Sequence, residues 1–130
     1  MKYAFRSFLS VIFLLILGGC YSVGHKSYVV DRDEEIGKLM EFKKPFKYKD
    51  SGSFNRGNFG IVGEGLTHIT KDSAGNLIYH FNEEEILPNF HTKEWVGKCL
   101  IYFVVDSDSH IIKDWGFDEG GNPLSCRVWP

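Results

Sequence analysis

Apolar runs separated by short polar turns dominate the second half of the chain, a pattern typical of antiparallel strands. The runs 66–70 and 77–81 flank a polar turn at 71–76, so the sequence predicts a β-hairpin there. Residues 99–105 are apolar at every position, which predicts a central strand covered on both faces. The run 111–117 follows an Asp- and Ser-containing turn and is the expected antiparallel partner of that strand.

One stretch before these runs has the period of an amphipathic helix. Asp31–Glu34 has the form of a capping box, in which an N-cap acceptor is followed three residues later by a glutamate. A narrow apolar stripe follows at Ile36, Leu39 and Met40, and Pro45 ends the helix. We therefore expect an α+β fold, with a small antiparallel sheet of three to four strands and one or two helices packed on one face.

Two further segments have weaker patterns. Residues 49–65 are rich in Gly, Ser and Asn and predict a surface loop, although their spacing differs from that of phosphate-binding loops. Residues 82–87 begin with Asn82 and three glutamates, which predicts a brief helical turn that Pro88 interrupts. The acidic triplet is interpreted as a solvated helix start and not as a metal site.

The first 20 residues have the architecture of a secretory signal. Lys2 and Arg6 precede the apolar run 8–17, and two glycines separate that run from Cys20. A transmembrane helix needs roughly 18 or more apolar residues, and this run is shorter. The segment is therefore expected to be cleaved.

The sequence Leu17-Gly18-Gly19-Cys20 resembles the lipobox of bacterial lipoproteins. That resemblance implies cleavage after residue 19 and a diacylglyceryl group and fatty acid, such as palmitate, on Cys20. Because the next residue, Tyr21, is not aspartate, analogy with lipoprotein sorting implies an outer-membrane protein that faces the periplasm. We expect a signal peptide at 1–19, an acylated tether at 20–30 and one globular α+β domain at 31–130. The alternative is a plain secretory signal with a chance cysteine.

The net charge of the chain restricts the class of partner that it can bind. The chain has 15 Lys and Arg against 17 Asp and Glu, and removal of Lys2 and Arg6 with the signal leaves 13 against 17. This negative balance predicts no nucleic-acid partner.

With Cys20 assigned to the lipid, Cys99 and Cys126 remain as a pair, and a disulfide is favoured in an oxidising compartment over a metal site or a catalytic thiol.

The C-terminal third resembles small envelope lipoproteins of the SmpA/OmlA type, which assist β-barrel assembly and have a fold related to the β-lactamase inhibitor protein. The residues that carry the resemblance lie between Cys99 and Arg127: a cysteine, an apolar strand, an Asp-containing turn, an Ile-rich strand, Trp115, a Gly-Asn turn and Cys126. The resemblance implies helices on one face of a small antiparallel sheet and an accessory role in outer-membrane assembly or envelope maintenance.

Motifs of catalysis are absent from the sequence, which contains no GxSxG, HExxH or CxxC. His68 and His80 are expected to approach each other across the hairpin as a polar pair on its solvated face. Asp106 and Asp108 resemble the start of a calcium loop, but the residues that follow do not, and a plain turn is favoured. We expect no enzyme, no metal and no cofactor.

Two functions of different classes remain. The favoured one is a lipid-anchored, non-enzymatic protein that binds an envelope protein. Its candidate interaction surface combines aromatic and basic residues: Lys43, Lys44, Phe54, Arg56, Phe59 and Trp129. The alternative is an envelope enzyme or a module that binds a small ligand or polymer through the Gly-rich loop and the 66–85 hairpin, which requires a concave pocket.

Overall fold

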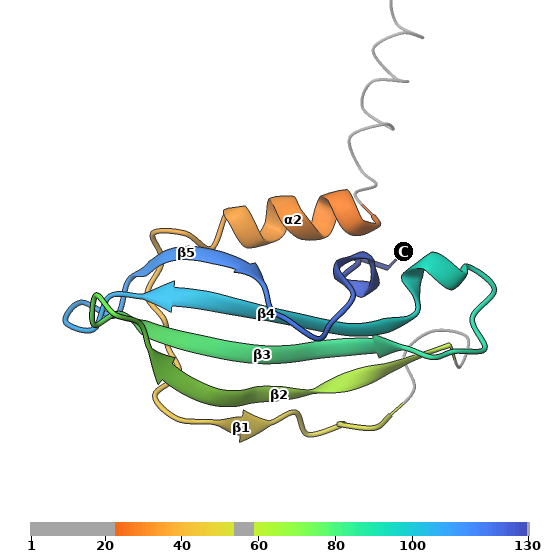
Figure 1. Ribbon diagram of the computed structural model, residues 1–130, viewed down its shortest axis with the longest axis horizontal. Helices are drawn as coiled ribbons and strands as arrows, with labels where there is room; N and C mark the ends of the chain where they lie inside the picture. Colours follow the sequence, from red (N-terminus) through yellow and green to blue (C-terminus); the bar gives the residue numbers. More distant parts are fainter. Residues whose placement is uncertain (1–22, 54–58, 130) are drawn as a thin grey trace, which may run out of the picture.

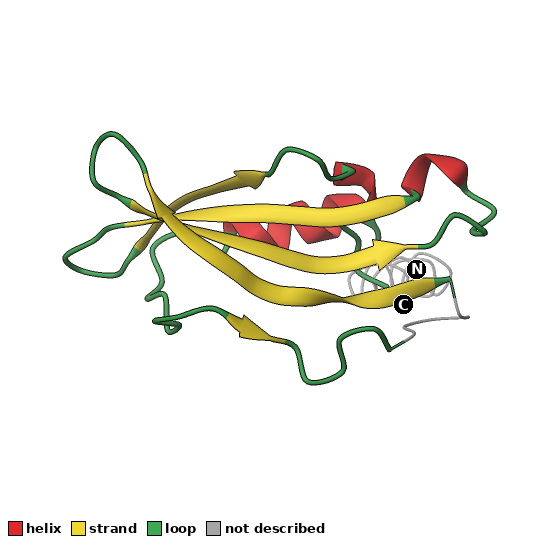
Figure 2. Cartoon of the chain, turned by 60° about the horizontal axis from the view of Figure 1, so that its bottom comes forward, coloured by secondary structure: helices red, strands yellow, loops and turns green. Residues whose placement is uncertain are grey.

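The computed structural model describes residues 23–53 and 59–129. In this part of the chain five antiparallel strands form one sheet whose spatial order is the chain order, as Figures 1 and 2 show. The strands are β1 (Phe46–Lys47), β2 (Gly60–Lys71), β3 (Leu77–Ile86), β4 (Gly97–Val105) and β5 (Ile112–Phe117). One α-helix, α2 (His25–Asp33), and two short 3₁₀ helices, η1 (Lys93–Trp95) and η2 (Pro123–Ser125), accompany the sheet in the described residues.

The predicted pairings of the central strands are confirmed. β2 and β3 form the expected hairpin, with His68 opposite His80. Its turn is closed by the carboxylate of Asp72, which accepts hydrogen bonds from the backbone N–H groups of Ala74 and Asn76. β4 pairs antiparallel with β5 after a turn in which Asp106 accepts from two following backbone N–H groups.

The predicted fold class is wrong in its proportions. The sheet has five strands instead of three or four, and a single nine-residue α-helix lies along it in the described residues. The additional strand is β1, in which Phe46 and Lys47 pair with Leu66 and Gly65 of β2. Two strands are also longer than expected: β2 already begins at Gly60, inside the predicted loop, and β3 continues to Ile86 through the predicted helical turn. Glycine suits the start of β2, since a Cβ at Gly63 would overlap the backbone of Asn82 in β3.

The predicted helix at 31–40 is also wrong. The helix begins at His25, inside the segment expected to be a tether, and Tyr28 on it is buried. Residues 37–40 instead bond to the edge of β5: Gly37 N–H donates to the Ile112 carbonyl, and Ile112 N–H donates to the Lys38 carbonyl. The free edge of β5 thus takes the backbone groups that a helix would have used.

The core lies on the α2 side of the sheet. Cys99, Ile101, Phe103 and Val105 alternate along β4, are all at most 5% exposed, and pack with Tyr28. The residues between them in β4 are partly exposed, so this strand is not covered on both faces as predicted. A helix is present on one side only in the described residues, which explains why only one face of β4 is fully buried.

Cys99 and Cys126 lie at disulfide-bonding distance, with Cα atoms 4.9 Å apart. Cys126 follows η2, and both sulfur-bearing residues are fully buried. This agrees with the predicted pairing of the two cysteines. The contact fixes the C-terminal segment to the middle of the core.

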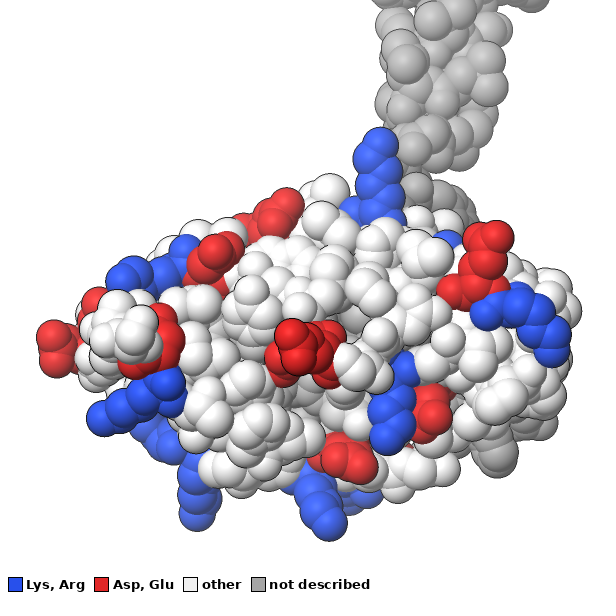
Figure 3. Space-filling view, in the orientation of Figure 1, with Lys and Arg blue, Asp and Glu red and all other residues white. Residues whose placement is uncertain are grey.

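The two ends of the described chain meet at one end of the sheet. Gly24 and Val128 exchange two backbone hydrogen bonds of 2.6 and 3.0 Å. Figure 1 shows the start of α2, η1, η2 and the C-terminal end gathered there, opposite the β2–β3 and β4–β5 turns. In Figure 3 acidic and basic side chains are interspersed on the visible face, and neither sign forms one continuous patch.

Candidate functional site

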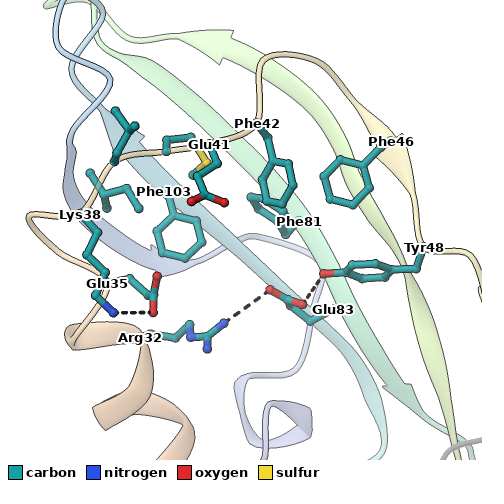
Figure 4. Close-up of a pocket in the computed structure, with 13 residues that line it drawn as sticks. Arg32, Glu35, Lys38, Glu41, Phe42, Phe46, Tyr48, Phe81, Glu83 and Phe103 are labelled. Atoms are coloured by element: carbon teal, nitrogen blue, oxygen red, sulfur yellow. Dashed lines mark hydrogen bonds and ion pairs between the residues drawn. The ribbon is translucent and has the colours of Figure 1, made fainter.

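A concave groove lies on the α2 side of the sheet. Its volume is about 490 Å³. The end of α2 and the segment leading to β1 form one wall, and strands β3 to β5 form the floor, as Figure 4 shows. Apolar and aromatic residues make up most of the lining: Leu39, Met40, Phe42, Phe46, Phe81, Phe103 and Ile112.

The aromatic rings of the groove hold one another in place. Phe42 and Phe46 lie 4.6 Å apart by ring centroids, and both contact Phe81 edge-on at 6.3 Å. Phe81 in turn contacts Phe103 at 5.7 Å. Phe81 and Phe103 are buried, whereas Phe42 is 44% exposed and Leu39 is 56% exposed. The rim therefore offers apolar surface to solvent above a rigid aromatic floor.

Polar groups converge at one end of the groove. The Tyr48 hydroxyl donates a 2.6 Å hydrogen bond to Glu83, and Arg32 lies 3.7 Å from the other oxygen of the same carboxylate. Burial and the neighbouring Glu83 carboxylate raise the pKa of Tyr48, so this residue remains a hydroxyl donor at neutral pH. The Arg32 Nε is buried and has no hydrogen-bond partner among the described residues. The groove thus combines an apolar floor with a fixed donor and acceptor set.

Tyr28 supports this polar end from beneath. The Arg32 guanidinium lies 5.0 Å from the centroid of the Tyr28 ring, in a cation–π arrangement. Burial raises the pKa of Tyr28, and its hydroxyl lies 3.6 Å from the Cys99 sulfur. The orientation of Arg32 in the groove therefore depends on how α2 packs on the disulfide region.

The candidate residues from the sequence fall into separate places. Cys20, Phe54 and Arg56 lie outside the described residues. Lys43 and Lys44 are exposed and follow the groove residue Phe42 in the chain. Phe59 and Trp129 belong to an aromatic cluster at the other end of the sheet.

We call this second feature the terminal aromatic cluster, which consists of Phe59, Phe90, His91, Trp95, Arg127 and Trp129. Phe90 is buried and contacts Phe59, Trp95 and Trp129, with ring centroids 5.3 to 6.2 Å apart. The Arg127 guanidinium stacks 3.6 Å from the centroid of the Trp95 ring. The Trp129 indole N–H and the Arg127 backbone N–H both donate to Glu84, at 3.1 Å each.

The histidines of the hairpin approach each other as predicted. The His68 and His80 rings are stacked, with centroids 4.0 Å apart and planes 3° apart. His80 Nδ1 lies 2.6 Å from the Asp118 carboxylate, and His80 Nε2 lies 2.8 Å from the Thr70 hydroxyl. This hydroxyl, imidazole and carboxylate chain is on the sheet face opposite α2, where His68 and Thr70 are solvent-exposed.

Among residues 23–53 and 59–129, no three or more His, Cys, Asp and Glu side chains are grouped so as to hold a metal ion. In the same residues no helix has the length and apolar character needed to cross a bilayer. The acidic residues 83–85, interpreted as a helix start, are instead on β3, where Glu83 enters the groove and Glu84 joins the terminal aromatic cluster.

The groove was not predicted, although one signal for it is present in the sequence. Between residues 42 and 49 the sequence interleaves three aromatic residues, Phe42, Phe46 and Tyr48, with lysines. Their actual neighbours, Phe81 and Phe103, come from strands distant in sequence. Comparisons of the chain with models of protein families, with curated proteins and with solved structures gave no match.

Proposed function

We propose that this protein is a lipid-anchored, non-enzymatic protein of the outer membrane that faces the periplasm and binds an envelope protein in the groove. The observation that carries the proposal is the exposed apolar rim of the groove. Leu39 and Phe42 expose 56% and 44% of their surface and line the same groove as the buried rings of Phe81 and Phe103. A well-packed apolar pocket of this kind is where the binding energy of protein interfaces concentrates.

The charges around the groove restrict the partner. Three carboxylates and two basic side chains line it: Glu35, Glu41, Glu83, Arg32 and Lys38. Arg32 faces Glu83 and Lys38 bonds to Glu35 at 3.3 Å, whereas Glu41 forms no ion pair within the described residues. We therefore expect an apolar or aromatic side chain of the partner to enter the groove, next to polar or basic neighbours.

The lipid anchor and the outer-membrane location rest on the resemblance of residues 17–20 to a lipobox. Three acyl chains hold a protein on a bilayer far more firmly than one, because each buried CH₂ contributes about 0.8 kcal/mol. Labelled palmitate should enter the wild type and be absent from Cys20→Ser. Equal labelling of the two proteins refutes the anchor.

The groove is tested separately by affinity capture from detergent-solubilised membranes. Leu39→Asp and Phe42→Asp place a charge on its rim and are expected to abolish recovery of the partner. Val30→Asp is the matched control, because Val30 is 49% exposed and does not line the groove. Equal recovery with all three variants removes the groove from the interface.

A small amphipathic ligand in the same groove is the second candidate. Its volume of about 490 Å³ lies within the usual range for small-molecule sites, and Arg32, Tyr48 and Glu83 converge there. Of the residues that line the groove, only Phe81 and Glu83 come from the 66–85 hairpin; the others lie between residues 32 and 48 and on β4 and β5. Native mass spectrometry distinguishes the two, since a retained small molecule that Phe42→Asp releases favours the ligand.

A further inference from the structure

The terminal aromatic cluster lies where the described chain begins. Gly24 pairs with Val128 through two backbone hydrogen bonds, and a Cβ at Gly24 would lie 3.1 Å from the Arg127 guanidinium. Arg127 itself stacks on Trp95. The first described residues therefore lie beside Arg127 of the cluster. Figure 1 shows the start of α2 next to the C-terminal segment.

The distance to the proposed lipid is short. Cys20 precedes Val23 by three residues. A fully extended chain spans at most about 3.6 Å per residue, so Cys20 lies within roughly 11 Å of Val23. Whatever path these residues take, a lipid on Cys20 keeps this end of the sheet next to the bilayer.

Exposed apolar side chains are present at the same end. Val23 is 44% exposed, Leu124 on η2 is 39% exposed and Phe59 is 38% exposed. Leu124 is connected to the cluster through its carbonyl, which accepts a hydrogen bond from Arg127. Trp95 and Trp129 are partly exposed beside them. Indole rings combine an apolar body with an N–H group and are enriched at the interface between lipid and water.

We infer that this end of the molecule, formed by Val23, Phe59, Leu124 and the two tryptophans, contacts the surface of the bilayer. The inference rests on the lipid anchor of the proposed function. It gives the domain a fixed orientation, because α2 leads away from this end and Arg32, near its C-terminus, enters the groove. The groove is then held away from the lipid, where a protein partner has access to it.

Three tryptophans allow a direct test by fluorescence quenching. The mature lipidated protein is reconstituted into vesicles of phosphatidylglycerol and phosphatidylcholine brominated near the top of its acyl chains. Trp115→Phe leaves only the two tryptophans of the cluster. Trp95→Phe with Trp129→Phe leaves only Trp115, which bonds to Asp33 at the far end of α2 and serves as the matched reporter.

Brominated lipid is expected to quench the Trp115→Phe protein strongly and the double variant weakly. Adding Leu124→Asp to Trp115→Phe should reduce quenching, and the cooperative unfolding of that variant shows that it remains folded. Flotation with vesicles reports the anchor separately. A protein that floats but shows equal quenching of both reporters overturns the membrane contact and leaves the anchor intact, whereas a protein that does not float overturns both.

Discussion

Replacement of Tyr28 by alanine tests whether residues before 31 belong to the fold. Tyr28 is 6% exposed and is the buried residue of α2. Its ring contacts Trp115 edge-on, with ring centroids 6.4 Å apart, and the Arg32 guanidinium stacks on its face. Burial of an aromatic side chain removes roughly 150–200 Å² from water, which at about 25 cal/mol per Å² corresponds to about 4–5 kcal/mol.

Tyr28→Ala is therefore expected to lower the free energy of unfolding by about 3–5 kcal/mol, the range measured for such truncations in cores. Small domains have about 5–15 kcal/mol in total, so this loss is large and easily measured by urea denaturation. Tyr28→Phe should lower the free energy of unfolding by about 1 kcal/mol or less, because sulfur is a weak hydrogen-bonding partner and lies 3.6 Å from the hydroxyl.

Val30→Ala controls for changes in helix propensity, since Val30 lies on the same helix and is 49% exposed. Its expected effect is within about 0.5 kcal/mol. A Tyr28→Ala protein as stable as Val30→Ala contradicts the packing of α2 and returns residues 23–30 to the role of a tether.

Three further changes test the fold by urea denaturation. Cys99→Ala with Cys126→Ala should lower stability by about 3.5 kcal/mol, the chain-entropy value for the 27-residue separation; an unchanged midpoint, or two free thiols in the wild type, contradicts the bond. Gly63→Ala should lower the free energy of unfolding by about 1–3 kcal/mol, because the added Cβ overlaps the backbone of Asn82 in β3. Gly37→Ala should have a smaller effect, because its Cβ would meet no atom within 4 Å and only the φ of 92° opposes the substitution. Burial raises the pKa of Glu84 above its ordinary value of 4.5, so the folded state binds the carboxyl proton more tightly than the unfolded chain. The free energy of unfolding should therefore fall as pH rises from about 4.5 towards the pKa of the folded state. Glu84→Gln should flatten this pH dependence, and parallel pH profiles of the wild type and the variant refute the role of Glu84.

The sheet was predictable where local pattern and tertiary structure agree. The hairpin of β2 and β3 has strong strand residues on both sides of a turn, and Asp72 supplies the side-chain acceptor that such turns favour. The pair β4 and β5 follows from the apolar run after Gly97 and from Asp106, whose pKa is lowered by the backbone N–H groups it accepts from. Local chemistry alone determines both turns.

The helix was mispredicted because a tertiary contact outweighs a local signal. Asp31 and Glu34 resemble a helix start but lie at the end of α2, which begins after Gly24 without any side-chain cap. Of the apolar stripe, Ile36 and Leu39 are 43% and 56% exposed. Their segment pairs with β5, and no periodicity within residues 31–40 encodes that pairing.

The groove could not be predicted from the sequence because it also depends on contacts between distant residues. Its polar end joins Arg32, Tyr48 and Glu83 through contacts between elements up to 51 residues apart in the chain. Glu83 faces the groove on the same side of β3 as Phe81, whereas the register shift between Asn82 and Glu84 places Glu84 opposite the core residue Cys99. The glutamate triplet gave no local indication of such a shift.

Site-specific photo-crosslinking in native membranes tests the central claim most directly. A photoreactive residue at position 39 is on the rim of the groove, and one at position 70 is also exposed, on the opposite face of the sheet. We expect one discrete protein adduct from position 39, lost when Phe42→Asp is added, and none from position 70. Identical adducts from both positions, or an adduct from Leu39 that persists in the Phe42→Asp background, contradict a partner bound in the groove.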